Sequence, residues 1–232
     1  MSAAAATASP GAVSNRIAIT ISIMLATVMQ SLDTTIANVA LPHMQGSVSA
    51  SQEQITWVLT SYIVAAAIAT PLTGWVSDRI GRKRLFLIAI AGFTVASVAC
   101  GMAENLAELV LFRLAQGLFG ACLVPLSQAV LLDIYPREQH GQAMAIWGAG
   151  AILGPILGPF LGGLLTENLN WRWVFYINVP VGALAFLGVW TFIAHDVKAQ
   201  AKKFDFLGFG ALALFIAGFQ MMLDRGPSQD WF

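Results

Sequence analysis

The sequence predicts an all-α protein that crosses a membrane several times. Of its 232 residues, 57% are apolar and only 10% are charged, whereas about a quarter of the residues of a soluble domain are charged. The apolar residues form stretches long enough to cross about 30 Å of hydrocarbon as helices. No stretch has the ten-residue alternating pattern typical of strands in a membrane barrel. The fold class is therefore a helical membrane bundle.

Seven apolar stretches predict seven membrane-spanning helices. Residues 1–16 are rich in Ala, Ser and Thr, which predicts a disordered cytoplasmic tail and not a signal peptide. Six helices are expected within residues 17–194 and a seventh at 206–223, with a basic cytoplasmic linker at 195–205 and a short outer stub at 224–232. The expected spans are Ile17–Leu41, Ile55–Val76, Leu85–Gly101, Leu106–Leu132, Gln142–Leu165, Trp173–Ala194 and Phe206–Leu223.

The distribution of Lys and Arg predicts a cytoplasmic N-terminus. When loops are assigned alternately to the two sides, nine basic residues lie inside and two, Arg172 and Arg225, lie outside, which the positive-inside rule favours. The inner residues are Arg16, Arg79, Arg82, Lys83, Arg84, Arg137, Lys198, Lys202 and Lys203. An odd helix count leaves the C-terminus outside, in a stub that looks like a truncation. The net charge of zero offers no basic surface for nucleic acid.

Two ionisable residues lie well inside predicted spans, and each costs about 2.5–3.5 kcal/mol at a helix centre. Asp33 lies about 12 Å below the outer end of the first span and Arg113 about 10 Å below the outer end of the fourth. Each has an amide three residues away on its own helical face, Gln30 for Asp33 and Gln116 for Arg113. These four residues predict a polar site that faces the bundle interior.

Two interpretations of this pair remain open. Asp33 and Arg113 could form a fixed structural ion pair, or could be satisfied separately by backbone and water. Alternatively, Asp33 could alternate between protonated and ionised forms, because burial favours the neutral form and a nearby Arg113 favours the charged one. Ionisable residues within a membrane are functional by default. Proton coupling of transport is therefore the favoured hypothesis, and a cationic substrate could compete for the same carboxylate.

The fifth predicted span carries glycines at every fourth position in the segment GAGAILGPILGPFLGG. Small residues at this spacing let a neighbouring helix approach closely, and each proline removes a backbone donor and bends the helix. Tight packing alone would explain the pattern, but we favour a conformational role, as a seam on which two bundles pivot. The segment includes Gly150, Gly154, Pro155, Gly158, Pro159, Gly162 and Gly163.

The inner loop between the second and third spans, GWVSDRIGRKR, combines glycines with an acid and several basic residues. Its positive charge could simply set topology. Its glycines predict unusual backbone geometry, and its charges beside a helix end would suit a latch built from ion pairs. The candidate latch residues are Gly74, Asp78, Arg79, Gly81 and Arg82.

Five of these segments together resemble the major facilitator superfamily. GWVSDRIGRKR is similar to its signature loop, and the glycine-rich segment is similar to its antiporter motif. LDTTIANVALP (Leu32–Pro42), FRLAQGLFGA around Arg113 and WRWVFYINVPVG (Trp171–Gly182) resemble motifs of the first, fourth and sixth helices of its fourteen-helix drug:proton antiporters. The resemblance runs from about Arg16 to Phe232 and is to the EmrB/QacA subfamily, especially its EmrB branch.

The resemblance implies a proton-driven exporter of hydrophobic or cationic drugs in the cell (inner) membrane. Asp33 and Arg113 match its coupling region, and Asp78 and Arg82 match its inner latch. Six helices would form the N-terminal half of the fold, with the seventh the first of two inserted helices. The C-terminal half is missing, so this chain alone should not transport. In Gram-negative relatives the partners would include a periplasmic adaptor and an outer-membrane channel.

Other functions have weaker support in the sequence. His43, His140 and His195 lie at separate membrane edges, which does not suit a membrane redox enzyme, and no nucleophile has a base at its own depth, as a hydrolase would need. The chain is thus not expected to be an enzyme or to hold a cofactor or metal, and a proton gradient would supply the energy. The remaining rivals are a half-transporter fragment, inactive alone or complemented by a second half, and a solute importer of the same superfamily.

Overall fold

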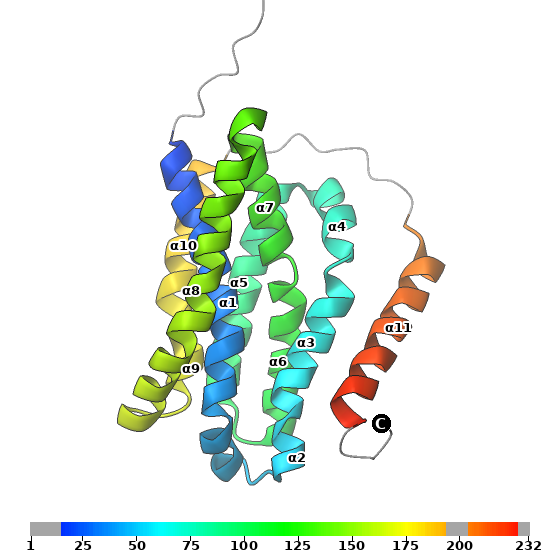
Figure 1. Ribbon diagram of the computed structural model, residues 1–232. Helices are drawn as coiled ribbons and strands as arrows, with labels where there is room; N and C mark the ends of the chain where they lie inside the picture. Colours follow the sequence, from blue (N-terminus) through cyan, green and yellow to red (C-terminus); the bar gives the residue numbers. More distant parts are fainter. Residues whose placement is uncertain (1–14, 194–203, 227–232) are drawn as a thin grey trace, which may run out of the picture.

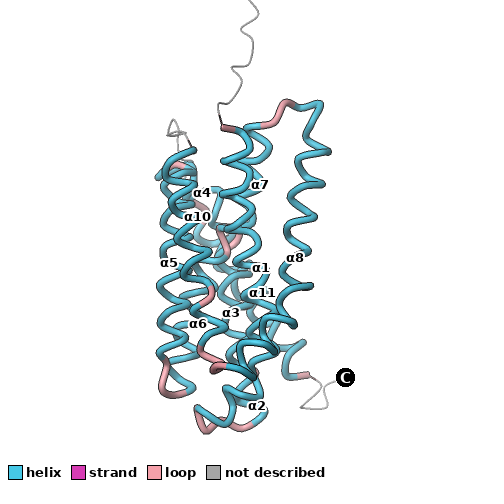
Figure 2. Tube along the Cα trace, turned by 90° about the vertical axis from the view of Figure 1, so that its left-hand side faces the viewer, coloured by secondary structure: helices cyan, strands magenta, loops and turns pink. Residues whose placement is uncertain are grey.

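The computed structural model describes residues 15–193 and 204–226, and within these ranges the regular elements are all helical (Figure 1). This confirms the predicted fold class. The long helices run in roughly the same direction, as Figure 2 shows from the side. In order they are α1 (Arg16–Ser47), α2 (Gln52–Ile55), α3 (Trp57–Ala69), α4 (Leu72–Ile80), α5 (Arg82–Met102), α6 (Leu106–Gly120), α7 (Leu123–Ile134), the short 3₁₀ helix η1 (Arg137–Gln139), α8 (His140–Asn168), α9 (Trp173–Tyr176), α10 (Asn178–Phe192) and α11 (Phe206–Arg225).

These helices supply six segments long and apolar enough to cross a membrane, and a seventh if one bent pair counts as a single span. The bent pair is Gln52–Ala69 with Leu72–Ile80, whose axes differ by 59°. All seven expected spans overlap these segments. The predicted tail, linker and outer stub fall almost entirely outside the described residues.

The first helix is longer than the sequence suggests. The apolar stretch from which it was predicted ends at Leu41. In the structure α1 continues through Pro42 to Ser47. Near its end, the indole nitrogen of Trp171 donates to the Ser47 hydroxyl at 2.9 Å, which connects α1 to the segment before α9.

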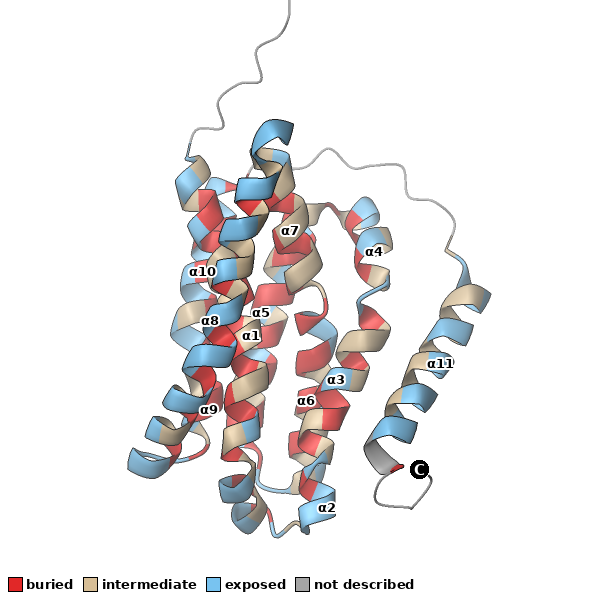
Figure 3. Ribbon diagram, in the orientation of Figure 1, coloured by how far each residue is buried: buried red, intermediate tan, exposed pale blue. Residues whose placement is uncertain are grey.

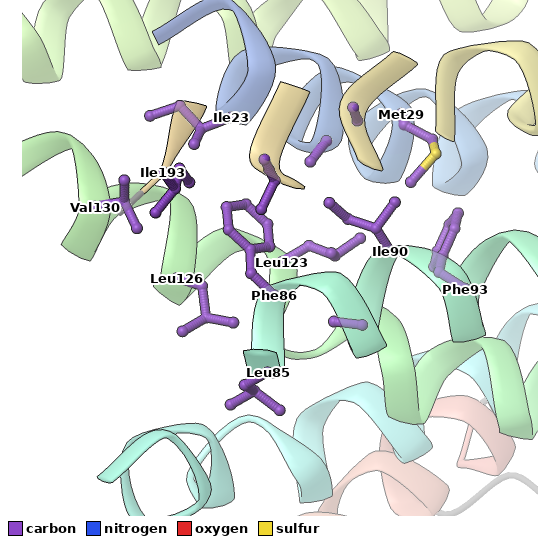
Figure 4. Packing of buried hydrophobic residues seen from close by; sticks show 14 of the residues in the cluster. Ile23, Met29, Leu85, Phe86, Ile90, Phe93, Leu123, Leu126, Val130 and Ile193 are labelled. Carbon is purple, nitrogen blue, oxygen red and sulfur yellow. The ribbon is translucent and has the colours of Figure 1, made fainter. Parts of the chain in front are cut away.

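The core consists of two apolar clusters stacked along the bundle axis, seen as the buried central faces in Figure 3. The first, shown in Figure 4, includes Ile23, Met29, Phe86 and Phe93. The second begins on α1 at Leu32 and includes Ile36, Met44, Val58, Leu109 and Phe175. On α1 the boundary between the two clusters falls between Met29 and Leu32, directly beside Asp33.

Basic side chains gather at the end of the bundle where α1 begins, uppermost in Figure 1. Arg16 reaches Gln139 of η1 at 3.4 Å, and Arg82 at the start of α5 pairs with Asp133 at the end of α7. Arg172 lies at the opposite end, where its guanidinium donates to the carbonyls of Gly101 and Ala103 at 2.7 and 2.6 Å. Among the described residues, Arg16 and Arg82, which were expected on the inner side, thus lie at one end of the bundle, and Arg172, which was expected on the outer side, lies at the other.

Helix α11 stands at the edge of the bundle beside α3 (Figure 1). Asp205 caps it, accepting a hydrogen bond from the Gly208 amide at 2.8 Å. Leu207 and Leu214 remain 85% and 78% exposed. Large apolar side chains so exposed to water would be unfavourable, but in a membrane they face lipid.

Candidate functional site

Asp33 of α1 and Arg113 of α6 form an ion pair in the centre of the bundle. The Arg113 Nη1 atom lies 2.6 Å from Asp33 Oδ2, and both side chains are inaccessible to solvent. The Nε atom of Arg113 also donates to the Val58 carbonyl of α3 at 3.2 Å. Three helices therefore hold this pair, as the polar site predicted from the sequence requires.

Two amide side chains complete the coordination of the Asp33 carboxylate. Gln116 Nε2 and Asn178 Nδ2 donate to Asp33 Oδ1 at 2.8 and 2.9 Å. Gln116 also accepts from Arg113 Nη1 at 2.8 Å, so it bridges the two charges. Three donors converge on the carboxylate, an arrangement that suits its ionised form.

Asn178 and Ser97 are members of the site that were not predicted from the sequence. Asn178 also donates to the Ser97 hydroxyl at 2.9 Å, and Ser97 donates to the Phe175 carbonyl at 2.8 Å. Asn178 begins α10, inside the segment WRWVFYINVPVG that resembles the sixth-helix motif. The sequence signal that could have identified Asn178 is its amide within a predicted span, since a polar group in hydrocarbon needs a hydrogen-bond partner.

Gln30 lies beside the ion pair and is linked to it through Tyr62. Its Nε2 atom donates to the hydroxyl of Tyr62 at 3.3 Å. The Tyr62 ring in turn lies against the guanidinium of Arg113, with 4.3 Å from Arg113 Cζ to the ring centroid. Gln30 therefore reaches the ion pair only indirectly, through an aromatic ring that forms a cation–π contact.

The buried network constrains what protonation of Asp33 could do. An ionised carboxylate only accepts hydrogen bonds, whereas a protonated carboxyl must also donate one. The three groups that hydrogen-bond to Asp33 all donate to it, so a protonated carboxyl would need an acceptor that none of these bonds provides. Arg113, which is paired to Asp33, would then be left without a counter-charge in an apolar environment.

The glycines of α8 form the contact surface with α1. Gly150, Gly154, Gly158 and Gly162 are all buried, and a Cβ atom at Gly158 would lie 2.7 Å from Thr35 Cβ. A Cβ at Gly154 would lie 2.5 Å from the Ser31 carbonyl carbon. Close approach requires glycine here. The stripe is thus a seam inside this bundle, whereas a Cβ at Gly163 would meet no atom within 4 Å, which places Gly163 off the seam.

The prolines of α8 are exposed and lie inside the helix. Pro155 cannot donate to the carbonyl of Ala151 four residues earlier. The hydroxyl of Ser31 on α1 donates to that carbonyl instead, at 2.8 Å, and Thr35 donates to the Gly154 carbonyl at 3.1 Å. Hydroxyl groups on the neighbouring helix thus satisfy the backbone of the proline-containing segment, as a low-dielectric environment demands.

The predicted latch residues lie at the basic end, but they do not form one cluster. Arg82 pairs with Asp133 across to α7, while Asp78 is exposed and contacts no charged partner among the described residues. Arg79 lies over the ring of Trp75, with 4.5 Å between its Cζ atom and the centroid.

Only one of the two loop glycines adopts the unusual backbone that was expected. Gly81 has φ 91° and joins α4 to α5. Gly74 lies within α4 and is not among the described residues with positive φ. The prediction of special geometry at Gly74 is therefore wrong, because α4 begins two residues earlier, at Leu72, and includes it.

Comparison with curated proteins gives long matches. The multidrug export protein EmrB of Escherichia coli K12 is 43% identical over 214 residues, covering 92% of this chain and 42% of EmrB. The fatty acid resistance protein FarB of Neisseria gonorrhoeae is 44% identical over 215 residues, with coverage of 92% and 42%. The chain thus spans about two-fifths of the length of these relatives.

Solved structures share the fold. The partially occluded inward-open conformation of the xylose transporter XylE from E. coli superposes with a TM-score of 0.70 at 17% identity, covering 94% of this chain and 58% of XylE. The peptide transporter POT in complex with sulfate gives 0.69 at 14% identity, covering 92% and 47%. Residues 23–226 also match the family model described as Major Facilitator Superfamily. The chain is therefore a multi-pass membrane protein that belongs to the major facilitator superfamily.

Proposed function

We propose that this chain forms the N-terminal half of a proton-coupled exporter of hydrophobic and cationic compounds, with its basic end in the cytoplasm. The names of the relatives, multidrug export proteins among them, support the substrate class. Their greater length supports the assignment to one half. The buried Asp33–Arg113 pair carries the proposal of proton coupling, because it is a titratable carboxylate held between separate helices in a membrane.

In the proposed cycle Asp33 is ionised in the present conformation and paired with Arg113. A proton arriving at Asp33 removes the charge that holds Arg113, and the contacts from α6 and α10 to α1 rearrange. Release of the proton on the other side restores the pair. Drug movement is coupled because the two bundles of a facilitator rock about a site between them.

The basic end supplies the proposed latch. Arg82 joins α5 to α7 through Asp133, and Gly81 provides the turn that positions Arg82. Asp78 is exposed and therefore accessible to a cationic side chain of the other half. An exposed pair contributes only about 0–1 kcal/mol, which suits a contact that must form and break in each cycle.

The proposed assembly contains parts beyond this chain. A second six-helix bundle is required to enclose the transport site, and α11 is proposed as an inserted helix between the halves. In a Gram-negative cell the exporter is proposed to sit in the inner membrane and to join a periplasmic adaptor and an outer-membrane channel.

Transport by the complete polypeptide in proteoliposomes tests the proposal. An imposed pH gradient should drive accumulation of a lipophilic cation such as tetraphenylphosphonium, and Asp33→Asn should abolish the gradient-driven part. Asp205→Asn is the matched control, because Asn also caps helices and Asp205 is exposed. Driven uptake by Asp33→Asn equal to that of the unmodified protein would contradict coupling through Asp33. A lack of uptake by the unmodified protein would contradict drug export itself.

A further inference from the structure

We propose that the groove between α5 and α10 binds one anionic phospholipid, with its phosphate at Arg84 and an acyl chain lying along the groove. This site is separate from the Asp33 network and does not depend on the proposed transport activity. The inference rests on two neighbouring hollows between α5 and α10, of which one is apolar and the other is basic.

The first hollow is an apolar groove of about 420 Å³. Its walls come from α5, at Ile90, Ala91 and Thr94, and from α10, at Ala183 and Phe186. The neighbouring surface is strongly apolar as well, since Val95 is 68% exposed and Leu187 is 58% exposed. In a membrane-spanning bundle such a groove faces hydrocarbon and accepts an acyl chain without desolvating polar groups.

The second hollow, of about 260 Å³, also lies between α5 and α10, nearer the basic end of the bundle. It is lined by Lys83, Arg84, Leu87 and Trp190. Leu87 precedes Ile90 by three residues on α5, and Trp190 follows Phe186 by four on α10. Residues three or four apart lie on one helical face, so the two hollows follow one another along α5 and α10, and we call them together the track.

The two basic residues of the second hollow play different parts. Lys83 is 7% exposed, and its ammonium donates to the carbonyls of Trp190 and Ile193 at 2.7 and 2.5 Å, at the C-terminal end of α10. Arg84 is its neighbour and is exposed, with no ion pair to any described residue. Lys83 thus joins α5 to α10, and Arg84 supplies the guanidinium that can form paired hydrogen bonds with a phosphate.

The position of Trp190 matches the membrane interface. Its ring is 60% exposed and stacks on Phe186, with centroids 6.0 Å apart. Exposed tryptophans of membrane proteins concentrate at the level of the lipid headgroups. Trp190 therefore marks the depth at which a phosphate beside Arg84 would lie.

The length and charge of the track favour a lipid over a compact ligand. Eleven residues separate Arg84 from Val95, or about 16 Å along the helix, which is about half of the hydrocarbon thickness. One leaflet of acyl chain has this length. Basic pockets between membrane helices are typical binding sites for anionic headgroups, and a zwitterionic lipid would gain less from Arg84.

Native mass spectrometry of the detergent-solubilised protein tests this assignment with phosphatidylglycerol and phosphatidylcholine of equal chain length. We expect one phosphatidylglycerol to bind more tightly than phosphatidylcholine. Arg84→Gln should weaken that binding about fivefold, as loss of one near-surface cation predicts. Arg137→Gln is the matched control, because it removes an equally exposed charge from the same end. Equal binding of both lipids, or equal effects of the two variants, would overturn the headgroup assignment.

The acyl-chain part has its own test. Ala183→Phe fills the groove and should weaken phosphatidylglycerol binding, whereas Ala211→Phe on the exposed face of α11 should not. Thermal unfolding in detergent alone checks that each variant is folded. If Ala183→Phe leaves phosphatidylglycerol binding unchanged, the chain does not lie in the groove. If it instead abolishes binding of tetraphenylphosphonium while Arg84→Gln does not, the groove is a drug site and the lipid assignment is wrong.

Discussion

The Asp33 carboxylate and the Arg113 guanidinium lie 2.6 Å apart in the centre of the bundle, although eighty positions separate them in the chain. They form a polar layer between two apolar clusters. Neither charge could remain alone in this environment, because the effective cost of burying an unpaired ion is several kcal/mol. The pair thus links α1 to α6 through their side chains.

Removing one partner of this pair should lower the stability of the protein more than removing both charges. Arg113→Gln leaves Asp33 charged and unpaired, and it should lower the free energy of unfolding by about 3–5 kcal/mol. The double variant Asp33→Asn with Arg113→Gln leaves no uncompensated charge and should recover part of that loss. Thermal unfolding in detergent measures both. A double variant less stable than Arg113→Gln would contradict this account.

Asn178 should contribute more to the stability of the protein than the size of its side chain suggests. Asn178→Ala removes a donor to Asp33 and should cost about 1–3 kcal/mol of stability. Asn178→Asp should cost more, because it places a second carboxylate beside the first. Ser97→Ala is the milder comparison, since it leaves the Asn178–Asp33 bond intact. The order of the three unfolding midpoints is the measurement, and a Ser97→Ala loss as large as that of Asn178→Asp would argue against this role.

The glycine seam predicts opposite outcomes for two nearby glycines of α8. Gly154→Ala would force α8 away from Ser31 and should cost about 1–3 kcal/mol, as overpacking does. Gly163→Ala meets no atom within 4 Å and should change stability by at most about 0.5 kcal/mol. The measurement is a comparison of the unfolding midpoints of the two variants, and the midpoint of Gly154→Ala should be the lower. Equal midpoints would mean that α1 and α8 are not in close contact at Gly154.

The hydroxyl of Ser31 should become dispensable if Pro155 is replaced. Ser31→Ala leaves the Ala151 carbonyl without its donor and should cost about 1 kcal/mol. Adding Pro155→Ala restores a backbone N–H for that carbonyl, so the double variant should be at least as stable as Ser31→Ala alone. Unfolding midpoints of the single and double variants test this compensation, and strictly additive losses would rule it out.

The turn between α4 and α5 should require glycine at one position only. Gly81→Ala places a side chain at φ 91° and ψ 147° and should cost about 1–3 kcal/mol. Gly74→Ala lies in a helix with open space around it and should be neutral or stabilising by about 0.5–1 kcal/mol. Thermal unfolding of the two variants, made in the same background, separates the predictions. A stable Gly81→Ala protein would show that the turn can adopt another backbone conformation.

The sequence predicted neither the partner of Gln30 nor the presence of Asn178 in the site, for a physical reason. Helical spacing places Gln30 on the face of Asp33, but it does not show that the Tyr62 hydroxyl of α3 accepts its hydrogen bond. Asn178 joins the site across 145 positions. Such a contact depends on the packing of α10 against α1 and α5, which no local pattern encodes.

The sequence by itself determined the class of protein and the position of its spans, because crossing hydrocarbon requires long apolar helices and makes every buried charge conspicuous. Asp33, Arg113 and the glycine spacing therefore stand out in the amino-acid sequence alone. Only the tertiary structure decided that the glycines of α8 pack on α1, that Arg82 pairs with Asp133, and that a basic hollow and an apolar groove both lie between α5 and α10. These relationships depend on how the helices are rotated against one another, and that rotation is fixed by interhelical packing.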